Sequence, residues 1–316
     1  MRAAYAIAAD PSHPLRALKV SEVPEPTPPE GWTVVDVRAA SLNHHDLWSL
    51  RGVGLPADRL PMILGCDAAG VDPDGNEVVV YPVVQDSADP RGYSLLSERF
   101  PGTLGERVAV PPENLVAKPA GVSFLDAACL PTAWLTAYSM LTGRGRIDEA
   151  SSVLVQGAGG GVATAAVALA VALGKRVYAT SRDPGKRERV TALGATAVEP
   201  GARLPERVDV VIESVGQPTF EHSMKCSAPG ARIVVCGATA GHQATVDLRR
   251  LFAMRLELLG STMGTRDELV ALLELMAEKE IRPVIDSTYG FSAIADAFAH
   301  LESGDVFGKV AVDYLH

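Results

Sequence analysis

The sequence contains few cysteines, and none of them lies near another. Only four of its 316 residues are cysteine, and no C-x-x-C pair occurs. A disulfide framework or a zinc knuckle requires closer spacing, so this spacing alone supports neither. Isolated cysteines are usually small buried hydrophobic residues, which we expect for Cys129, Cys226 and Cys236. Cys66 is treated below together with its neighbours.

Basic residues and long apolar runs are also scarce. The 29 Lys and Arg are outnumbered by 38 Asp and Glu, and the net charge of −9 argues against nucleic-acid binding. The longest apolar run, residues 162–173, is too short to cross a bilayer. The start MRAAYAIAADP lacks the charged and apolar regions of a signal peptide. We therefore expect a cytoplasmic globular protein that binds a small molecule and contacts neither nucleic acid nor membrane.

Two sequence textures divide the chain. Short β-rich runs, such as 33–40 and 76–84, alternate with Pro- and Gly-rich turns as far as residue 120, which predicts a partly open β-barrel. From residue 121, apolar strands alternate with helical segments, which predicts βαβ units in a parallel sheet. After residue 284 the chain is expected to return to the first domain and to end on a strand at GKVAVDYL.

Two further segments carry a local prediction. Residues 85–105 show no periodicity, and we expect an irregular loop that could move over a site. The segment TRDELVALLELMAEKEI predicts an amphipathic helix that begins with a capping box of Thr265 and Glu268. The apolar face of this helix contains Leu269, Leu272, Leu273 and Met276.

The segment VLVQGAGGGVATAAVALAVALG is the most specific local motif. An apolar strand leads into a glycine cluster and then into an alanine-rich helix; the loop residues are Gly157, Gly159, Gly160, Gly161 and Val162. Glycines permit a tight turn and let backbone N–H groups approach a pyrophosphate at a helix N-terminus. A turn alone needs no ligand, but here a second strand follows roughly 20 residues later, as in dinucleotide-binding units.

The end of that second strand, RVYATSRDPGKRE, predicts the type of nicotinamide cofactor. NAD sites carry an acid here, whereas this chain has Ser181, Arg182 and Lys186. Hydroxyls and cations suit a ribose 2′-phosphate, so we predict NADP(H). Asp183 is the competing acid, although the Pro-Gly pair after it is typical of a turn. The alternative is that these charges are solvated at the start of a helix.

The chain resembles the medium-chain dehydrogenase/reductase superfamily over nearly its whole length. The resemblance is carried by SLNHHDLW, PMILGCDAAGV, GERVAVPPENLVAKP, ACLPTAWLTAY, the glycine loop, DVVIESVG, GARIVVCGATAG and FGKVAV. It implies an α/β fold: a Rossmann doubly wound parallel sheet (121–284) and a GroES-like β-barrel catalytic domain (1–120, with a C-terminal return at 285–316). It also implies an active site in the cleft between them, and a homodimer paired through LELLGS (256–261).

Zinc-using members of this superfamily need three ligands, and the matching positions here are Asn43, Cys66 and Thr132. An amide and a hydroxyl do not hold zinc well, and the four-cysteine lobe of such relatives is missing. The chain therefore resembles the zinc-free, quinone oxidoreductase-like branch, and we predict no metal. The alternative is a different cation site formed by Cys66 and Asp67 with His44 or His45.

The resemblance also assigns roles in the catalytic domain. Asn43 and His45 are expected to bind the substrate carbonyl oxygen, and His45, oriented by Asp46, is expected to supply a proton. The alternative is that His45 and Asp46 only brace a loop. The residues expected to contact substrate are Trp48, Cys66, Thr132 and Trp134.

Further cofactor contacts are carried over by position. Thr136 is expected beside the nicotinamide, and Lys309 is expected to reach the phosphates. The remaining contacts follow the later Rossmann strands; they are Ser214, Val215, Cys236, Gly237, Ala238, Gly260 and Ser261.

Three functions remain compatible with the sequence. Without a metal, only hydrogen bonds stabilise the developing oxyanion, which favours an activated acceptor such as a quinone or an enone. We therefore predict a zinc-independent, NADPH-dependent quinone or enone oxidoreductase. The alternatives are an alcohol or aldehyde dehydrogenase of the same superfamily and an NADP-binding sensor without turnover.

Overall fold

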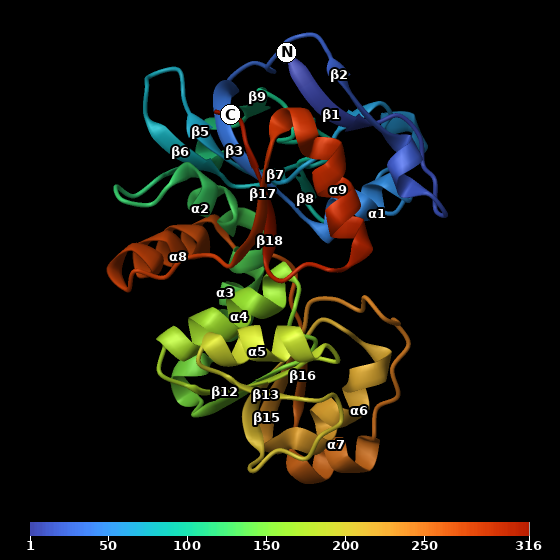
Figure 1. The fold of residues 1–316 in the computed structure, drawn as a ribbon, viewed down its shortest axis with the longest axis vertical. Coiled ribbons are helices and arrows are strands. Elements are labelled where there is room, and N and C mark those ends of the chain that lie inside the picture. Colours follow the sequence, from blue (N-terminus) through green and yellow to red (C-terminus); the bar gives the residue numbers. More distant parts are fainter. Residues whose placement is uncertain (316) are drawn as a thin grey trace. The chain divides into compact units, whose positions relative to one another are not determined.

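The computed structural model describes residues 1–315, which form two compact units (Figure 1). The first unit comprises Met1–Thr132, Leu269–Ala277 and the chain from Ile285 onward, and the second comprises Ala133–Glu268 and Glu278–Val284. The first unit extends past residue 120 because helix α2 (Phe124–Ala128) packs against its strands β3 (Thr33–Leu42) and β5 (Asp67–Val71).

The first unit is built mainly of short antiparallel strands. Its remaining strands are β1 (Arg2–Ala6), β2 (Leu18–Glu22), β4 (Met62–Ile63), β6 (Glu77–Val80), β7 (Val83–Gln85), β8 (Tyr93–Leu95), β9 (Arg107–Val110), β10 (Leu115–Ala117), β17 (Ile285–Gly290) and β18 (Lys309–Asp313). The main sheet has the order β10-β6-β5-β3-β18-β17, with β9 also on β3. Helices α1 (His44–Leu50) and α9 (Ile294–Ser303) cover a core that contains Leu42, Leu47, Phe298 and Val310. The GroES-like fold is confirmed.

Strand register brings distant residues of this unit together. Strand β3 pairs antiparallel with both β18 and β5, which places Leu42 opposite Val310 and Ser41 opposite Asp67. The C-terminal end of β3 therefore meets the first residues of β5 and of β18. The position of the site residues in this unit depends on that register.

Residues 85–105, called the insert below, were predicted as irregular together with a strand just before them, and this is only partly correct. The run 76–84 is not one strand but breaks at Tyr81-Pro82 into β6 and β7, because Pro82 cannot donate a ladder hydrogen bond. Strand β7, which ends at the first residue of the insert, pairs with β8 within it and forms a hairpin. Leu96, Ser97 and Leu104 are fully buried, so these parts of the insert are anchored in the unit.

The second unit contains a doubly wound parallel sheet with the strand order β13-β12-β11-β14-β15-β16. Its strands are β11 (Ser152–Val155), β12 (Arg176–Thr180), β13 (Thr196–Val198), β14 (Val208–Glu213), β15 (Ser227–Val235) and β16 (Glu257–Gly260). Its helices are α3 (Leu135–Ser139), α4 (Gly161–Ala172), α5 (Pro184–Ala192), α6 (Gln217–Cys226) and α7 (Leu248–Met254). The strand order reverses direction after β13. Since crossovers are right-handed, α4 and α5 lie on one face and α6 and α7 on the other (Figure 1).

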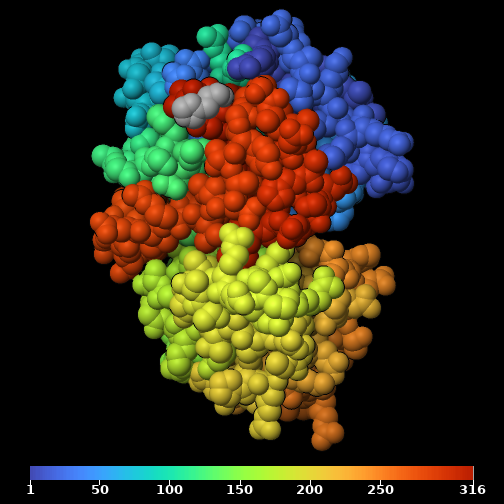
Figure 2. Space-filling view, in the orientation of Figure 1, coloured from blue at the N-terminus to red at the C-terminus, as the bar shows by residue number. Residues whose placement is uncertain are grey.

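Buried apolar residues hold both faces of this sheet. On one face, Leu154, Val211 and Ile233 of the strands pack against two residues of α6, Phe220 and Met224. Helix α4 packs against β11 and β12 from the opposite face, and Figure 2 shows the atoms of α4 and α5 in lime and yellow at the surface of this unit. In the described part of the chain no helix is both long and apolar enough to cross a membrane.

Helix α8 (Arg266–Glu278) begins as the sequence predicts. Thr265 and Glu268 form the reciprocal capping box, with Glu268 N 3.1 Å from Thr265 Oγ1 and Thr265 N 2.7 Å from a Glu268 carboxylate oxygen. The four apolar residues predicted for one face of this helix, Leu269, Leu272, Leu273 and Met276, are all buried.

Candidate active site

The glycine loop follows β11 and turns sharply at Gly157. This residue has φ +71°, and a Cβ on it would lie 2.4 Å from Val215 Cγ2. Its N–H donates to Thr180 Oγ1 at 3.0 Å, and that hydroxyl donates to Gln156 Oε1 at 2.8 Å. Only glycine fits here, because both the conformation and the space exclude a side chain.

Helix α4 begins without a side-chain cap. Its N-cap residue is Gly160, and no acidic residue lies in its first turn. By contrast, α5 and α7 are capped by Asp183 and Asp247. The space that a Cβ on Gly160 would enter is open within 4 Å. An uncapped N-terminus beside open space suits a phosphate group, since backbone N–H groups and the helix dipole both attract an anion. Gly159, Gly161 and Val162 complete this loop and the first helical turn.

The end of β12 carries the residues predicted to select the cofactor. Asp183 accepts from Lys186 N at 2.8 Å and is the N-cap of α5, so it begins a helix and is not the turn residue that the Pro-Gly pair suggested. Ser181 is buried, Arg182 is exposed and Lys186 is half-buried. Arg187 is engaged elsewhere, because it donates to the carbonyl oxygens of Ser181 and Arg182. The strand end thus offers a hydroxyl and two cations.

The loops after β14, β15 and β16 lie at the same edge of the sheet, because carboxyl ends of parallel strands share an edge. Buried Glu213 accepts from the N–H groups of Val215 and Gly216 at 2.9 and 3.0 Å and so fixes the loop that begins at Ser214. Cys236 N donates to Glu213 O. Burial raises the pKa of the Cys236 thiol to about 12, so the thiol stays protonated. Gly237 and Ala238 follow β15, and Gly260 and Ser261 end or follow β16.

Thr136 lies beside the segment that follows β16. Its hydroxyl is 3.8 Å from Met263 Sδ, and Met263 has a left-handed φ of +54°. Neighbouring Trp134 is fully buried, and its indole N–H lacks a hydrogen-bond partner among the described residues. The ring of Trp134 thus belongs to the core, and its contact with substrate stays a prediction.

Lys309 does not occupy the position predicted for it. Its side chain is 2% exposed, and its ammonium donates to Leu42 O, Asn43 Oδ1 and Asp67 Oδ2 at 2.8, 2.6 and 3.1 Å. Three donations use all three ammonium hydrogens, so none remains for a cofactor phosphate. The physical reason is the buried Asp67 carboxylate, whose charge needs a partner inside the protein.

Asn43 belongs to the same buried cluster. Its Nδ2 donates to Asp67 Oδ2 at 2.8 Å, and the Ser41 hydroxyl lies 2.7 Å from the same oxygen. The side-chain carbonyl oxygen of Asn43, Oδ1, accepts from the Lys309 ammonium. One amide hydrogen of Asn43 is thus used by the protein, and the second is available to a ligand.

The three positions at which zinc-using relatives hold their metal offer a poor donor set. Cys66 Sγ donates to Leu96 O at 3.2 Å, and Thr132 Oγ1 is buried without a partner among the described residues. Cys66 precedes Asp67, the first residue of β5, and the two side chains contact different groups, so they do not converge on one cation. Within residues 1–315 no group of three His, Cys, Asp or Glu side chains could hold a metal. The alternative cation site is not formed.

His45 lies between Cys66 and the insert. Its Nε2 is 3.2 Å from Glu98 Oε1, and its Nδ1 is 3.6 Å from Cys66 Sγ and 3.5 Å from Ser97 Oγ. Burial by itself would lower the pKa of His45, but the Cys66 sulfur and the Glu98 carboxylate outweigh it, and the pKa is raised well above 6.5. Burial raises the pKa of the Cys66 thiol. With the Cys66 thiol neutral, the ionised Glu98 carboxylate is the charged group in contact with the ring, so the protonated form of the imidazole depends on Glu98.

Asp46 does not orient His45, contrary to the sequence prediction. Its two carboxylate oxygens accept from Asn43 N at 2.8 Å and from Gly65 N at 2.9 Å. As residue N3 of α1 it closes a capping box, which is the bracing role left open above. The carboxylate that contacts the imidazole belongs to Glu98, which no sequence pattern singled out.

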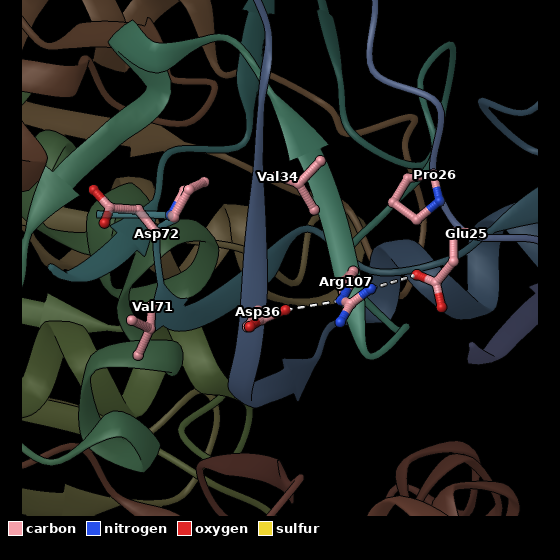
Figure 3. Close-up of a pocket in the computed structure, with 8 residues that line it drawn as sticks. Glu25, Pro26, Val34, Asp36, Val71, Asp72 and Arg107 are labelled. Atoms are coloured by element: carbon pink, nitrogen blue, oxygen red, sulfur yellow. Dashed lines mark hydrogen bonds and ion pairs between the residues drawn. The ribbon is translucent and has the colours of Figure 1, made fainter. Parts of the chain in front are cut away.

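The residues predicted to contact substrate differ in exposure. Cys66 is almost fully buried, whereas Trp48 is 37% exposed and its ring lies under the Arg51 guanidinium. A surface hollow of about 330 Å³ lies elsewhere on the first unit, where Arg107 bridges Asp36 and Glu25 (Figure 3). None of its lining residues was predicted as a site residue, and its ion pairs are exposed, so we assign it no function.

Comparisons with known proteins agree with this geometry. The alcohol dehydrogenase GroES-like domain matches residues 29–120, and the zinc-binding dehydrogenase family matches residues 185–312. An acryloyl-coenzyme A reductase of Sulfurisphaera tokodaii is 27% identical over 95% of this chain and 97% of the relative. A 2-methylene-furan-3-one reductase of Solanum lycopersicum is 30% identical over 92% of this chain and 74% of the relative. A crystal structure of an NAD-dependent alcohol dehydrogenase is 32% identical, with a TM-score of 0.87 over 99% of each chain.

Proposed function

The chain belongs to the medium-chain dehydrogenase/reductase superfamily, and on that premise we propose that it is a zinc-independent, NADPH-dependent reductase of activated acceptors, either α,β-unsaturated carbonyl compounds or quinones. The observation that carries the proposal is the position of the Lys309 ammonium, 2.6 Å from Asn43 Oδ1 and 3.1 Å from Asp67 Oδ2. A fixed positive charge beside the first ligand position repels a divalent cation.

The residues of the second unit fit NADP(H). The uncapped N-terminus of α4 at Gly160 suits the pyrophosphate, and Ser181, Arg182 and Lys186 suit the ribose 2′-phosphate. Thr136 lies next to the segment after β16, where the nicotinamide would be held. The bound cofactor supplies a hydride. The protein supplies binding, orientation and a proton.

The first unit supplies the polar groups for an activated acceptor. Hydride addition to a conjugated carbon moves charge onto the carbonyl oxygen, where hydrogen bonds can stabilise it. The free amide hydrogen of Asn43 is one such donor, and the protonated His45 is the proton source. The compounds for which two relatives are named, acryloyl-CoA and a 2-methylene-furan-3-one, each contain a C=C bond conjugated to a carbonyl group, which supports this acceptor class.

An alcohol dehydrogenase is the second candidate function. It is favoured by the 32% identity to an NAD-dependent alcohol dehydrogenase. Oxidation of an unactivated alcohol without a metal would leave the alkoxide to be stabilised by Asn43 and His45 alone, which is a weaker arrangement than a Lewis acid provides.

One experiment separates these functions. The purified protein is assayed for metal content and for oxidation of NADPH and NADH with enones, quinones and aldehydes, and for reduction of NADP⁺ with alcohols. We expect turnover of enones or quinones with NADPH, no effect of chelators, and a fall in kcat but not in NADPH affinity for His45→Gln. Stoichiometric zinc required for turnover, or preference for NADH, would contradict the proposal.

The chain is further proposed to work in the cytoplasm as a homodimer. Strand β16 is an edge strand, and Leu248 and Phe252 on the adjacent α7 are 67% and 72% exposed. An unpaired edge beside exposed apolar side chains favours pairing with a second copy. The molecular mass in solution tests the homodimer, and a monomer at micromolar concentration would contradict that part of the proposal.

A further inference from the structure

His45 is held differently at its two ring nitrogens. The Nε2 contact with Glu98 Oε1 is 3.2 Å, whereas the Nδ1 contacts with Ser97 Oγ and Cys66 Sγ are 3.5 and 3.6 Å. A distance of 3.5 Å from nitrogen to oxygen is at the limit of a hydrogen bond. The ring is therefore anchored through Nε2, and Nδ1 is the less strongly bound nitrogen.

Glu98 is itself fixed by its surroundings. Its other oxygen accepts from Arg91 Nη2 at 3.0 Å, and Arg91 also pairs with Asp89. Burial opposes ionisation of Glu98, but the hydrogen bonds from His45 and Arg91 outweigh it, so the pKa of Glu98 is lowered. An ionised carboxylate can only accept, and this requires a hydrogen on His45 Nε2.

The backbone of the insert holds Glu98 at this place. Ser97 is fully buried and has φ +70°, a conformation that is costly for a residue other than glycine. Ser97 N donates to Phe100 O at 2.8 Å, and Glu98 N donates to Leu95 O at 3.2 Å. The turn thus maintains a strained backbone that directs Glu98 at the imidazole.

The charged or titratable groups that face His45 are Cys66, Glu98 and Asp46. Asp46 is occupied by backbone N–H groups, and burial keeps the Cys66 thiol neutral. Glu98 is therefore the group that determines which ring nitrogen carries the fixed hydrogen.

We propose that Glu98 is the positioning residue of His45: its carboxylate fixes a hydrogen on Nε2 and leaves Nδ1 as the nitrogen that gives up the proton. The step is a proton transfer from Nδ1–H to the reduced acceptor, after which His45 is neutral with its hydrogen on Nε2. The proton transfer to an acceptor rests on the proposed function. The claim that Glu98 fixes the hydrogen on His45 Nε2 does not.

The test uses Glu98→Gln, which preserves size and removes the charge. Arg91 is a donor, so it would hold the new amide oxygen and turn the amide NH₂ toward Nε2, which must then accept. In ¹⁵N NMR of histidine-labelled protein at alkaline pH, wild-type His45 should be the Nε2–H tautomer and Glu98→Gln the Nδ1–H tautomer; His45→Gln assigns the signal. With the acceptor found above, kcat should fall about 100-fold while KM changes by less than about threefold.

Asp86→Asn is the matched control. It removes a different ion pair of the insert, between Asp86 and Arg99, without contacting His45, and it should keep the wild-type tautomer and kcat. If Glu98→Gln does not fold, Arg91→Met is used, because Arg91 is exposed. It removes the hydrogen bond that holds the Glu98 carboxylate in place and should lower kcat about tenfold at unchanged KM.

The outcomes separate the two proposals. An unchanged tautomer in Glu98→Gln, an unchanged kcat, or an equal loss in Asp86→Asn would overturn the role of Glu98. If the wild type oxidises no NADPH with any acceptor, the proposed function fails. The tautomer measurement then still decides whether Glu98 fixes the ring.

Discussion

Two glycines of the cofactor loop should respond to the same substitution in opposite ways. At Gly157 an alanine meets both a left-handed φ of +71° and Val215 Cγ2 at 2.4 Å. The conformation costs about 1–2 kcal/mol, and the close contact costs about 1–3 kcal/mol more. We expect Gly157→Ala to lose roughly 2–5 kcal/mol of unfolding free energy, measured by urea denaturation.

At Gly160 the backbone is ordinary, with φ −79°, and no atom lies within 4 Å of the added Cβ. Gly160→Ala should therefore change the unfolding free energy by less than about 0.5 kcal/mol. Its methyl group would occupy the space at the N-terminus of α4. NADPH affinity, measured by fluorescence titration, should fall about tenfold, which corresponds to about 1.4 kcal/mol.

A second substitution divides the cost at Gly157 into its two parts. Val215→Ala removes the atom that the new Cβ would contact, so Gly157→Ala should be less costly in that background by about 1–3 kcal/mol. The conformational part should remain. A stable Gly157→Ala variant, a destabilised Gly160→Ala variant, or the absence of coupling to Val215 would refute the reasoning.

The remaining predictions concern the buried pair of the first unit. Lys309→Met leaves Asp67, which is 0% exposed, without its cation, and should cost about 3–5 kcal/mol by urea denaturation, whereas exposed Lys279→Met should change stability by less than about 0.5 kcal/mol. Lys309→Met combined with Asp67→Asn removes both charges and should recover part of the loss; a double variant less stable than Lys309→Met alone would show that the pair is not the cause.

Patterns within a few residues of each other predicted local structure well. The glycine loop and the Thr265–Glu268 capping box form as expected, because each depends on backbone geometry within about one turn of helix or one tight turn. The doubly wound sheet was predictable for a similar reason, since alternating apolar strands and helices have few ways to pack.

The site in the first unit was predicted less well. Lys309 was assigned to the cofactor, and Asp46 to His45, because position in a motif does not tell which group a side chain contacts. Lys309 and Asp67 are 242 positions apart and meet only through the pairing of β3 with β5 and β18. Glu98 is 53 positions from His45, in a segment without periodicity.

The sequence by itself determined the two-part architecture, the glycine loop with its uncapped helix, and the poor donor set at the three metal positions. Those features depend on residue type and short-range spacing. Only the tertiary structure decided that Lys309 neutralises Asp67 and that Glu98, not Asp46, contacts His45. Buried charges take whichever partner strand register and loop geometry bring within hydrogen-bond distance, and that distance is unrelated to separation along the chain.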